Sequence, residues 1–202
     1  ANGMTLRKVL GTVAEFRQQD AQTPIVMMGY ANPIERFGHE AFADACAEAG
    51  VDGLITVDLP PEEVEATDAA LQAVGLDNIF LISPTTPEHR IKMIVERARG
   101  FIYCVAVKGV TGSGQLDTAA VCESVALIRA KTLLPIAVGF GIRDAESARA
   151  VATTADAVVV GSALIDKMQQ AAAAGNTSQI QVHRAAVKLL QSIRAGVDSS
   201  PS

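Results

Sequence analysis

The sequence predicts an α/β fold of the phosphate-binding (β/α)8 TIM barrel type, here incomplete, with six strands seen and the first two strands missing. Two observations carry this prediction. Short apolar runs alternate with helical patterns along the chain, and two glycine-rich loops follow the last two runs. Hydrophobic residues make up 49% and charged residues 19% of the 202 residues, which is typical of a globular chain. We expect one barrel domain over residues 1–196 and a flexible tail over residues 197–202.

The strands are predicted from apolar runs that are short enough to be buried on both faces, as in a parallel sheet. The runs start roughly 20 to 35 residues apart, which leaves room for a helix in most of the connections. They are Ile25–Met28, Leu54–Val57, Ile79–Ile82, Ile102–Val107, Ile136–Val138 and Ala157–Val160.

The helices are predicted from apolar faces and from residues that begin or end helices. Leu6, Val9, Leu10, Val13 and Phe16 form one apolar face before the first run. The pair Asn32-Pro33 is expected to open the next helix, which Gly50 closes. The same reasoning gives further helices over Pro60–Gly75, Thr86–Gly100, Thr118–Ala130, Asp144–Thr153, Ser162–Ala173 and Ser178–Ala195.

Charge and composition exclude several classes of protein. The net charge of −5 argues against a nucleic-acid binder, which would carry a basic face. No apolar run reaches the roughly 20 residues that span a bilayer. The three scattered cysteines favour free thiols in a reducing cytoplasm, and the three histidines form no cluster with them. We therefore expect a cytoplasmic protein without a metal site.

The strongest candidate site is a pair of adjacent loops, Gly139–Asp144 and Gly161-Ser162-Ala163, each of which follows a strand and opens a helix. Small residues let backbone N–H groups approach an anion, and helix N-termini favour negative charge. In barrels a phosphate site commonly follows strands 7 and 8. The alternative is that the glycines only form tight turns. Strand count alone favours an open, doubly wound sheet, but the loop pair favours the barrel.

Other candidates each have a competing structural interpretation. The loop Gly109–Gly114 is a lid or a simple connection. Asp58 follows a strand and is either an acid/base or a residue that fixes the turn before Pro60. Lys108 could form a Schiff base if desolvated, but an exposed loop cation explains it better. Tyr30 and Tyr103 lie at strand ends and form an aromatic pocket or pack in the core.

These motifs, taken in order, resemble the α chain of tryptophan synthase. The matching stretches are Pro24–Pro33, Val51–Glu63, Gly109–Gly112, Gly139–Ile142 and Gly161–Ala163. The resemblance implies a (β/α)8 barrel lyase of tryptophan biosynthesis. That enzyme cleaves indole-3-glycerol phosphate to indole and glyceraldehyde 3-phosphate by a retro-aldol reaction. It also implies an α2β2 heterotetramer with a tryptophan synthase β chain, which holds pyridoxal phosphate, whereas the α chain needs no cofactor.

The resemblance also assigns roles to individual residues. The phosphate would lie against Gly112, Phe140, Gly141, Gly161 and Ser162. The indole would lie near Tyr30, Tyr103, Met28 and Ile55, and Thr111 would support a catalytic carboxylate from the lid. Asn32, Asp58 and Pro60 would face the β chain. The family's catalytic Glu and Asp belong to an N-terminal segment that this sequence does not match, so no catalytic residue is assigned.

Two other functions remain open at this point. The chain could be a non-catalytic phosphate-binding fragment that docks a β-chain partner. Less favoured is a Schiff-base aldolase that uses Lys108.

Overall fold

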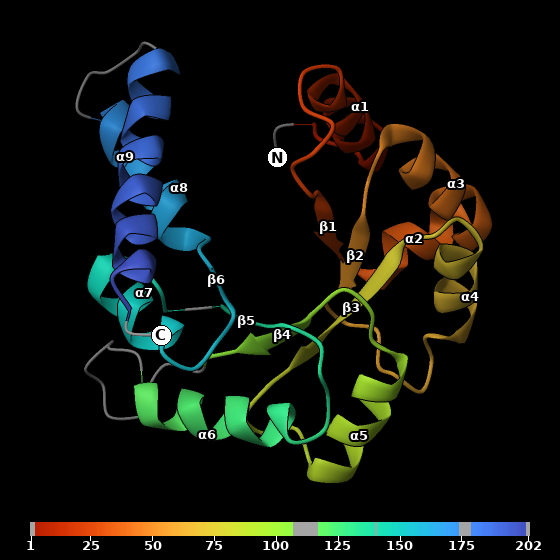
Figure 1. The fold of residues 1–202 in the computed structure, drawn as a ribbon. Coiled ribbons are helices and arrows are strands. Elements are labelled where there is room, and N and C mark those ends of the chain that lie inside the picture. Colours follow the sequence, from red (N-terminus) through yellow and green to blue (C-terminus); the bar gives the residue numbers. More distant parts are fainter. Residues whose placement is uncertain (1–2, 107–116, 140, 174–178, 201–202) are drawn as a thin grey trace. The chain divides into compact units, whose positions relative to one another are not determined.

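A computed structural model describes residues 3–106, 117–139, 141–173 and 179–200. Six strands form one sheet, and they follow chain order in it, from β1 to β6 (Figure 1). The neighbours β1 and β2, β2 and β3, and β5 and β6 pair in parallel. A doubly wound sheet would reverse the strand order at a switch point. The strand order is therefore that of a (β/α) barrel, as the loop pair predicted.

All six predicted strands are present, with bounds that shift by one or two residues at most ends. They are β1 (Val26–Gly29), β2 (Gly53–Thr56), β3 (Asp77–Ile82), β4 (Ile102–Val105), β5 (Ile136–Gly139) and β6 (Ala157–Val159). Every residue of β2 and β5 is buried, which explains why these strands read as continuous apolar runs.

The helices confirm the alternation and correct three boundaries. They are α1 (Leu6–Arg17), α2 (Ala31–Phe37), α3 (His39–Ala49), α4 (Glu65–Ala73), α5 (Glu88–Arg97), α6 (Thr118–Arg129), α7 (Ala145–Ala152), α8 (Ser162–Ala173) and α9 (Gln179–Asp198). The helix predicted to run from Asn32 to Gly50 is two helices, because Gly38 lies between them with φ 90°. The helix predicted at Pro60 begins at Glu65, and α9 extends to Asp198, two residues into the predicted tail.

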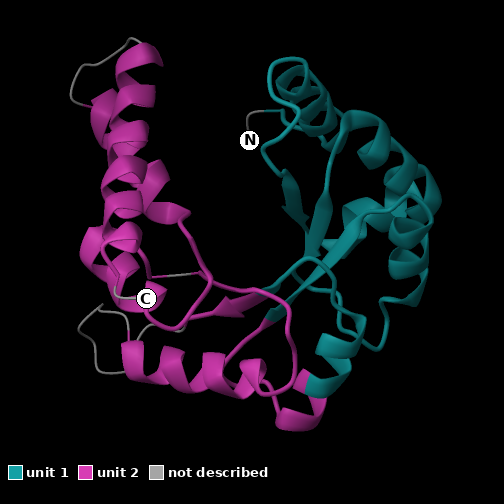
Figure 2. Cartoon of the chain, in the orientation of Figure 1, with its two compact units in different colours: residues 1–81, 92–102 teal, residues 82–91, 103–202 magenta. Residues whose placement is uncertain are grey.

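The chain divides into two compact units, shown in Figure 2. Unit 1 comprises Ala1–Leu81 and Lys92–Ile102, and unit 2 comprises Ile82–Ile91 and Tyr103–Ser202. In unit 1, the outward-facing side chains of β1 and β2 pack with α1, α3 and α4 in a core that includes Leu54, Phe42 and Leu71. These three side chains are almost completely buried, so each provides a large hydrophobic contribution to stability.

Unit 2 has its own buried core and a long terminal helix. Ile128 of α6 and the β5 residues Ile136 and Val138 are completely buried. Helix α9 packs on both α7 and α8 (Figure 1). Gly196 allows the close approach to α7, since a side chain there would overlap the backbone of Ala145.

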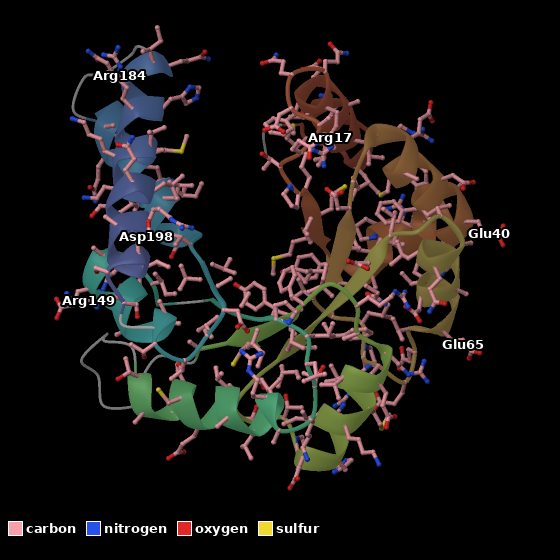
Figure 3. All side chains as sticks on the ribbon, in the orientation of Figure 1. Arg17, Glu40, Glu65, Arg149, Arg184 and Asp198 are labelled. Atoms are coloured by element: carbon pink, nitrogen blue, oxygen red, sulfur yellow. The ribbon has the colours of Figure 1, made fainter. Side chains whose placement is uncertain are left out.

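A group of hydrogen bonds around Arg17 fixes the N-terminal ends of β1 and β2 in unit 1. Arg17, which Figure 3 labels, is the last residue of α1. It donates from Nη2 to Asp52 Oδ2 at 2.6 Å, from Nε to Gly50 O at 2.7 Å and from Nη1 to Thr23 O at 2.7 Å. The same Asp52 oxygen accepts the backbone N–H of Ile25 at 2.6 Å. We call this group of residues the Arg17 clamp.

Unit 2 contains an equivalent group, the Arg129 clamp, at the start of β5 and β6. Arg129 ends α6 and forms an ion pair with Asp156, whose Oδ2 also accepts the N–H of Ile136 at 2.7 Å. Burial alone would raise the pKa of Asp156, but the hydrogen bonds from Arg129 and from the Ile136 N–H bring it below its ordinary value. Asp156 is therefore held as a carboxylate.

Candidate functional site

The first predicted phosphate loop leaves the buried end of β5 in unit 2. Gly139 ends this strand, and Ile142 anchors the loop because its side chain is buried. Between them Gly141 has φ 83°, a left-handed conformation that favours glycine. The backbone conformation of the loop therefore favours glycine at this position. The absence of a side chain would also let a ligand approach the backbone closely.

The helix that follows this loop, α7, is capped by its own chain. Asp144 accepts the backbone N–H of Ser147 at 2.8 Å, and Ser147 completes a capping box with it. These hydrogen bonds from the backbone and side chain of Ser147 lower the pKa of Asp144. The N-terminus of α7 thus carries a negative charge, so an anion would bind to the loop ahead of Asp144 rather than at the helix end.

The second loop connects β6 to α8 and is open to solvent. Gly161 and Ser162 are both exposed, and α8 begins at Ser162. A side chain at Gly161 would meet no atom within 4 Å. The N-terminal end of this twelve-residue helix is thus accessible, as the prediction of an anion site requires.

Tyr103 lies directly against the first loop. Its side chain is buried and covers the inner side of Gly139, where an added Cβ would overlap the tyrosine hydroxyl. Burial raises the pKa of Tyr103, so the ring remains a neutral phenol. The structure therefore brings a predicted indole residue into contact with the strand end that starts a predicted phosphate loop. The sequence placed Gly139 in a predicted phosphate loop but did not predict its contact with Tyr103, although a glycine at the end of a buried strand is a signal for such a close approach.

The remaining predicted indole residues lie in unit 1. Met28 of β1 and Ile55 of β2 are register partners, so they share one face of the sheet. Tyr30 follows β1 and is 62% exposed. Met28 and Tyr30 also line a pocket of about 260 Å³ together with residues of α1, but Ile55 does not. The pocket therefore overlaps with the predicted indole set without containing all of it.

The residues predicted to face a partner lie at the start of α2 and on the loop after β2, both in unit 1. Asn32 is the second residue of α2 and is exposed, while Asp58 and Pro60 follow β2. The carboxylate of Asp58 accepts the backbone N–H of Ala31 at 2.7 Å. This hydrogen bond fixes the start of α2, whereas the sequence-based alternatives for Asp58 were an acid/base and a residue that fixes the turn before Pro60.

Several predicted residues cannot be placed. Thr111, Gly112, Phe140 and Lys108 lie outside the described residues. Within the described part, no group of His, Cys, Asp and Glu residues is arranged to hold a metal ion. Nor is any helix in that part both long and apolar enough to cross a membrane.

A wider groove of about 760 Å³ lies between α3 and α4 and contains none of the predicted site residues. It is lined by His39, Glu40 and Asp44 of α3 and by alanines of α4. Figure 3 shows Glu40 and Glu65 projecting outward from these two helices. The groove therefore lies on the helix side of unit 1, away from the loops at the strand ends.

Sequence comparisons give a consistent answer. The family model described as tryptophan synthase alpha chain matches residues 1–194. The tryptophan synthase alpha chain of Dechloromonas aromatica is 52% identical over 198 residues, which is 98% of this chain and 72% of that protein. That of Thioalkalivibrio sulfidiphilus is 58% identical over 167 residues, or 83% of this chain and 63% of that protein. The chain thus spans about two thirds of the length of these relatives.

Solved structures agree with the sequences. Tryptophan synthase subunit alpha from Legionella pneumophila superposes with a TM-score of 0.86 at 38% identity, covering 97% of this chain and 71% of that one. Tryptophan synthase from M. tuberculosis, in its aminoacrylate-bound form, gives a TM-score of 0.80 at 34% identity over 96% of this chain and 69% of that one. The strand order, the glycine-rich loops and the sequence similarity over nearly the whole of this chain agree. The chain belongs to the tryptophan synthase alpha chain family.

Proposed function

We propose that this chain acts on indole-3-glycerol phosphate in the lyase reaction of its family, which yields indole and glyceraldehyde 3-phosphate. The observation that carries the proposal is the contact of Tyr103 with Gly139. It sets an aromatic ring beside the start of a loop suited to an anion. A substrate with an indole at one end and a phosphate at the other, joined by three carbons, matches such a pairing.

The reaction breaks the bond between indole C3 and the adjacent glycerol carbon. The hydroxyl on that carbon loses its proton as the carbon becomes an aldehyde, and C3 gains a proton as indole leaves. A positioned acid or base typically accelerates such a step by about 10²–10⁴-fold. Asp58 bonds to a backbone N–H, so we assign it no proton transfer. We assign the acid/base role to no residue of this chain.

Substrate binding is divided between two sets of residues. In the proposal, Gly141, Gly161 and Ser162 hold the phosphate, together with Gly112 and Phe140. The residues proposed for the indole are Tyr103, Tyr30, Met28 and Ile55, of which Tyr103 lies against the start of the first phosphate loop. Thr111 assists from the loop after β4. The open start of α8 supports the phosphate part, because the partial positive charge of a helix N-terminus attracts phosphate.

The proposed partner is a tryptophan synthase β chain, in an α2β2 assembly, with pyridoxal phosphate bound by the β chain and no cofactor in this chain. The solved relative from M. tuberculosis is a tryptophan synthase in an aminoacrylate-bound form. We place the docking surface at Asn32, Asp58 and Pro60, which follow the C-terminal ends of the neighbouring parallel strands β1 and β2.

A binding assay and an indole-release assay test this function together. Indole-3-glycerol phosphate is titrated into the 202-residue chain, alone and with a β chain, and indole is measured. Gly161→Asp should weaken binding at least about tenfold by adding a negative charge at the phosphate site. The matched control is Gly11→Asp, because Gly11 on α1 is also exposed and has no neighbour within 4 Å.

The outcomes separate the proposed function from its alternatives. Binding with indole release supports the lyase. Binding with no release in either mixture favours the non-catalytic phosphate-binding fragment. Absence of binding contradicts the proposal. Borohydride treatment with substrate should leave Lys108 unlabelled, and a labelled Lys108 would favour the Schiff-base aldolase instead.

A further inference from the structure

We infer that Asp58 is a positioning residue for Tyr30, and that its carboxylate connects the proposed partner surface to the proposed indole site. This inference rests on the proposed function, since both ends of the connection are named by it. The juxtaposition that carries it is a hydrogen bond between the start of α2 and the loop after β2, from the Ala31 N–H to Asp58 Oδ1, at 2.7 Å.

Hydrogen bonds hold the backbone on both sides of Tyr30. Before it, Gly29 O accepts the N–H of Val57 at 2.9 Å and extends the pairing of β1 with β2. After it, Ala31 donates to Asp58. Tyr30 itself is extended, with φ −103° and ψ 155°. The two bonds therefore fix the direction in which the Tyr30 side chain leaves the strand end.

Few packing contacts hold the Tyr30 ring, so its orientation depends on the hydrogen bonds of the neighbouring backbone. Tyr30 is 62% exposed, in contrast to the buried Tyr103. An exposed side chain keeps its orientation only as well as its backbone does. Loss of the Asp58 hydrogen bond should consequently loosen Tyr30 more than it loosens the core of unit 1.

The local sequence explains why an acceptor from another loop is needed. Ala31 is the first residue of α2, so its N–H has no partner within the helix. Tyr30 is the N-cap residue, and its side chain makes no capping hydrogen bond. A neighbouring carboxylate supplies the missing acceptor, and a charged acceptor makes a stronger hydrogen bond than a neutral one.

The same hydrogen bond lies between the residues proposed to meet a partner. Asn32 follows Ala31 directly, and Pro60 lies two residues after Asp58. A partner chain that binds to Asn32 or Pro60 therefore moves the donor or the acceptor of the bond that holds Tyr30. Docking and indole binding should thus be coupled through Asp58.

The test compares Asp58→Ala with Asp58→Asn, whose amide oxygen can still accept. Hydrogen exchange of the Ala31 amide should become about tenfold faster in Asp58→Ala, as expected for loss of a hydrogen bond to a charged group, and should be largely restored in Asp58→Asn. The Val57 amide is an internal control and should keep its protection. Glu63→Ala is the matched control variant, because Glu63 is an exposed carboxylate on the same loop.

A second variant removes the donor instead of the acceptor. Ala31→Pro deletes the N–H at the first helical position, where proline is tolerated, and Tyr30 already has the extended backbone that proline requires of the residue before it. Either variant should weaken binding of indole-3-glycerol phosphate several-fold. The double variant should bind indole-3-glycerol phosphate no more weakly than the single variant with the larger loss of affinity, because both changes remove the same hydrogen bond.

The inference is overturned if the Ala31 amide exchanges at an unchanged rate in Asp58→Ala. It is also overturned if exchange accelerates while substrate affinity is unchanged, or if the two single effects add in full. Failure of the proposed function gives a different result, because the wild-type chain would then bind no substrate. The exchange measurement would still report on the hydrogen bond between Ala31 and Asp58.

Discussion

The Arg17 clamp of unit 1 and the Arg129 clamp of unit 2 have the same design. In each, an arginine ends the helix before a strand, and an aspartate stands one residue ahead of the next strand. The aspartate oxygen accepts both the arginine and a backbone N–H at the start of the earlier strand, that of Ile25 just before β1 or of Ile136, the first residue of β5. In both clamps a carboxylate accepts a backbone N–H where a strand begins, and an arginine balances the charge of that carboxylate.

The two clamps differ in how far the cation is removed from water. The Arg17 side chain is 16% exposed and bonds to three backbone carbonyls in addition to Asp52. The Arg129 side chain is 38% exposed and reaches one backbone carbonyl, that of Leu134, at 3.4 Å. The same motif should therefore stabilise unit 1 more than unit 2, since removal of the less exposed Arg17 leaves more acceptors without a donor.

The largest expected effect is the difference between the two arginine deletions. Arg17→Ala should lower the free energy of unfolding by about 3 kcal/mol, because it leaves four acceptors, two of them part-buried, without their donor. Arg129→Ala should lower it by about 1 kcal/mol, the range of a solvent-exposed ion pair. Urea unfolding followed by circular dichroism measures both. Equal losses would show that the extra bonds of Arg17 contribute nothing.

A smaller effect is expected from the glycine that contacts the Arg17 side chain. Gly50 has φ 85°, and a Cβ there would lie 2.8 Å from Arg17 Cγ. Gly50→Ala should cost about 1–2 kcal/mol from backbone strain and this contact. Gly75→Ala is the matched control, because Gly75 has φ 76° but no neighbour within 4 Å. In an Arg17→Ala background the two glycine substitutions should cost the same amount, and a persisting difference would exclude the contact as its cause.

The smallest expected effect is a pH dependence of the stability of unit 2. The folded-state pKa of Asp156 lies below its ordinary value of 3.8, so the carboxylate form is the one that folding favours. Its contribution to stability is complete above that value and is lost as the pH falls through the lower folded-state pKa. Since both partners are more than a third exposed, the contribution should stay below about 1 kcal/mol. Thermal melts from pH 5 to 2.5 should show a shallower acid slope in Asp156→Asn, and an identical slope would contradict the assignment.

The strands were predictable because burial on both faces produces an apolar run that can be read locally. The break at Gly38 was missed, because the flanking apolar pattern continues through it and only the φ angle of the glycine reveals two helices. The α4 start was placed early because Pro60-Pro61 is a common helix opening, whereas the loop continues to Val64 before the helix forms. Local signals thus located the elements better than their ends.

The candidate site was predicted as separate residues, but not as contacts. Tyr103 and the loop from Gly139 were both selected, yet their contact joins residues 36 positions apart and depends on the register of β4 and β5. Asp58 was placed at a strand end, but its acceptor role depends on an N–H at the start of α2. The two clamps were not predicted, because nothing in the local pattern distinguishes Arg17 or Arg129 from other helix-terminal arginines.

The proposed pairing of Tyr103 with the phosphate loop is tested most directly by calorimetric titration. Indole-3-glycerol phosphate and glycerol 3-phosphate are each titrated into the wild-type chain and into Gly139→Ala. The wild-type chain should bind the indole compound at least about tenfold more tightly, as burial of an aromatic ring would give. Gly139→Ala should remove most of that advantage by displacing Tyr103, and should retain the binding of glycerol 3-phosphate. Equal affinity of the wild-type chain for both compounds would contradict the proposed pairing.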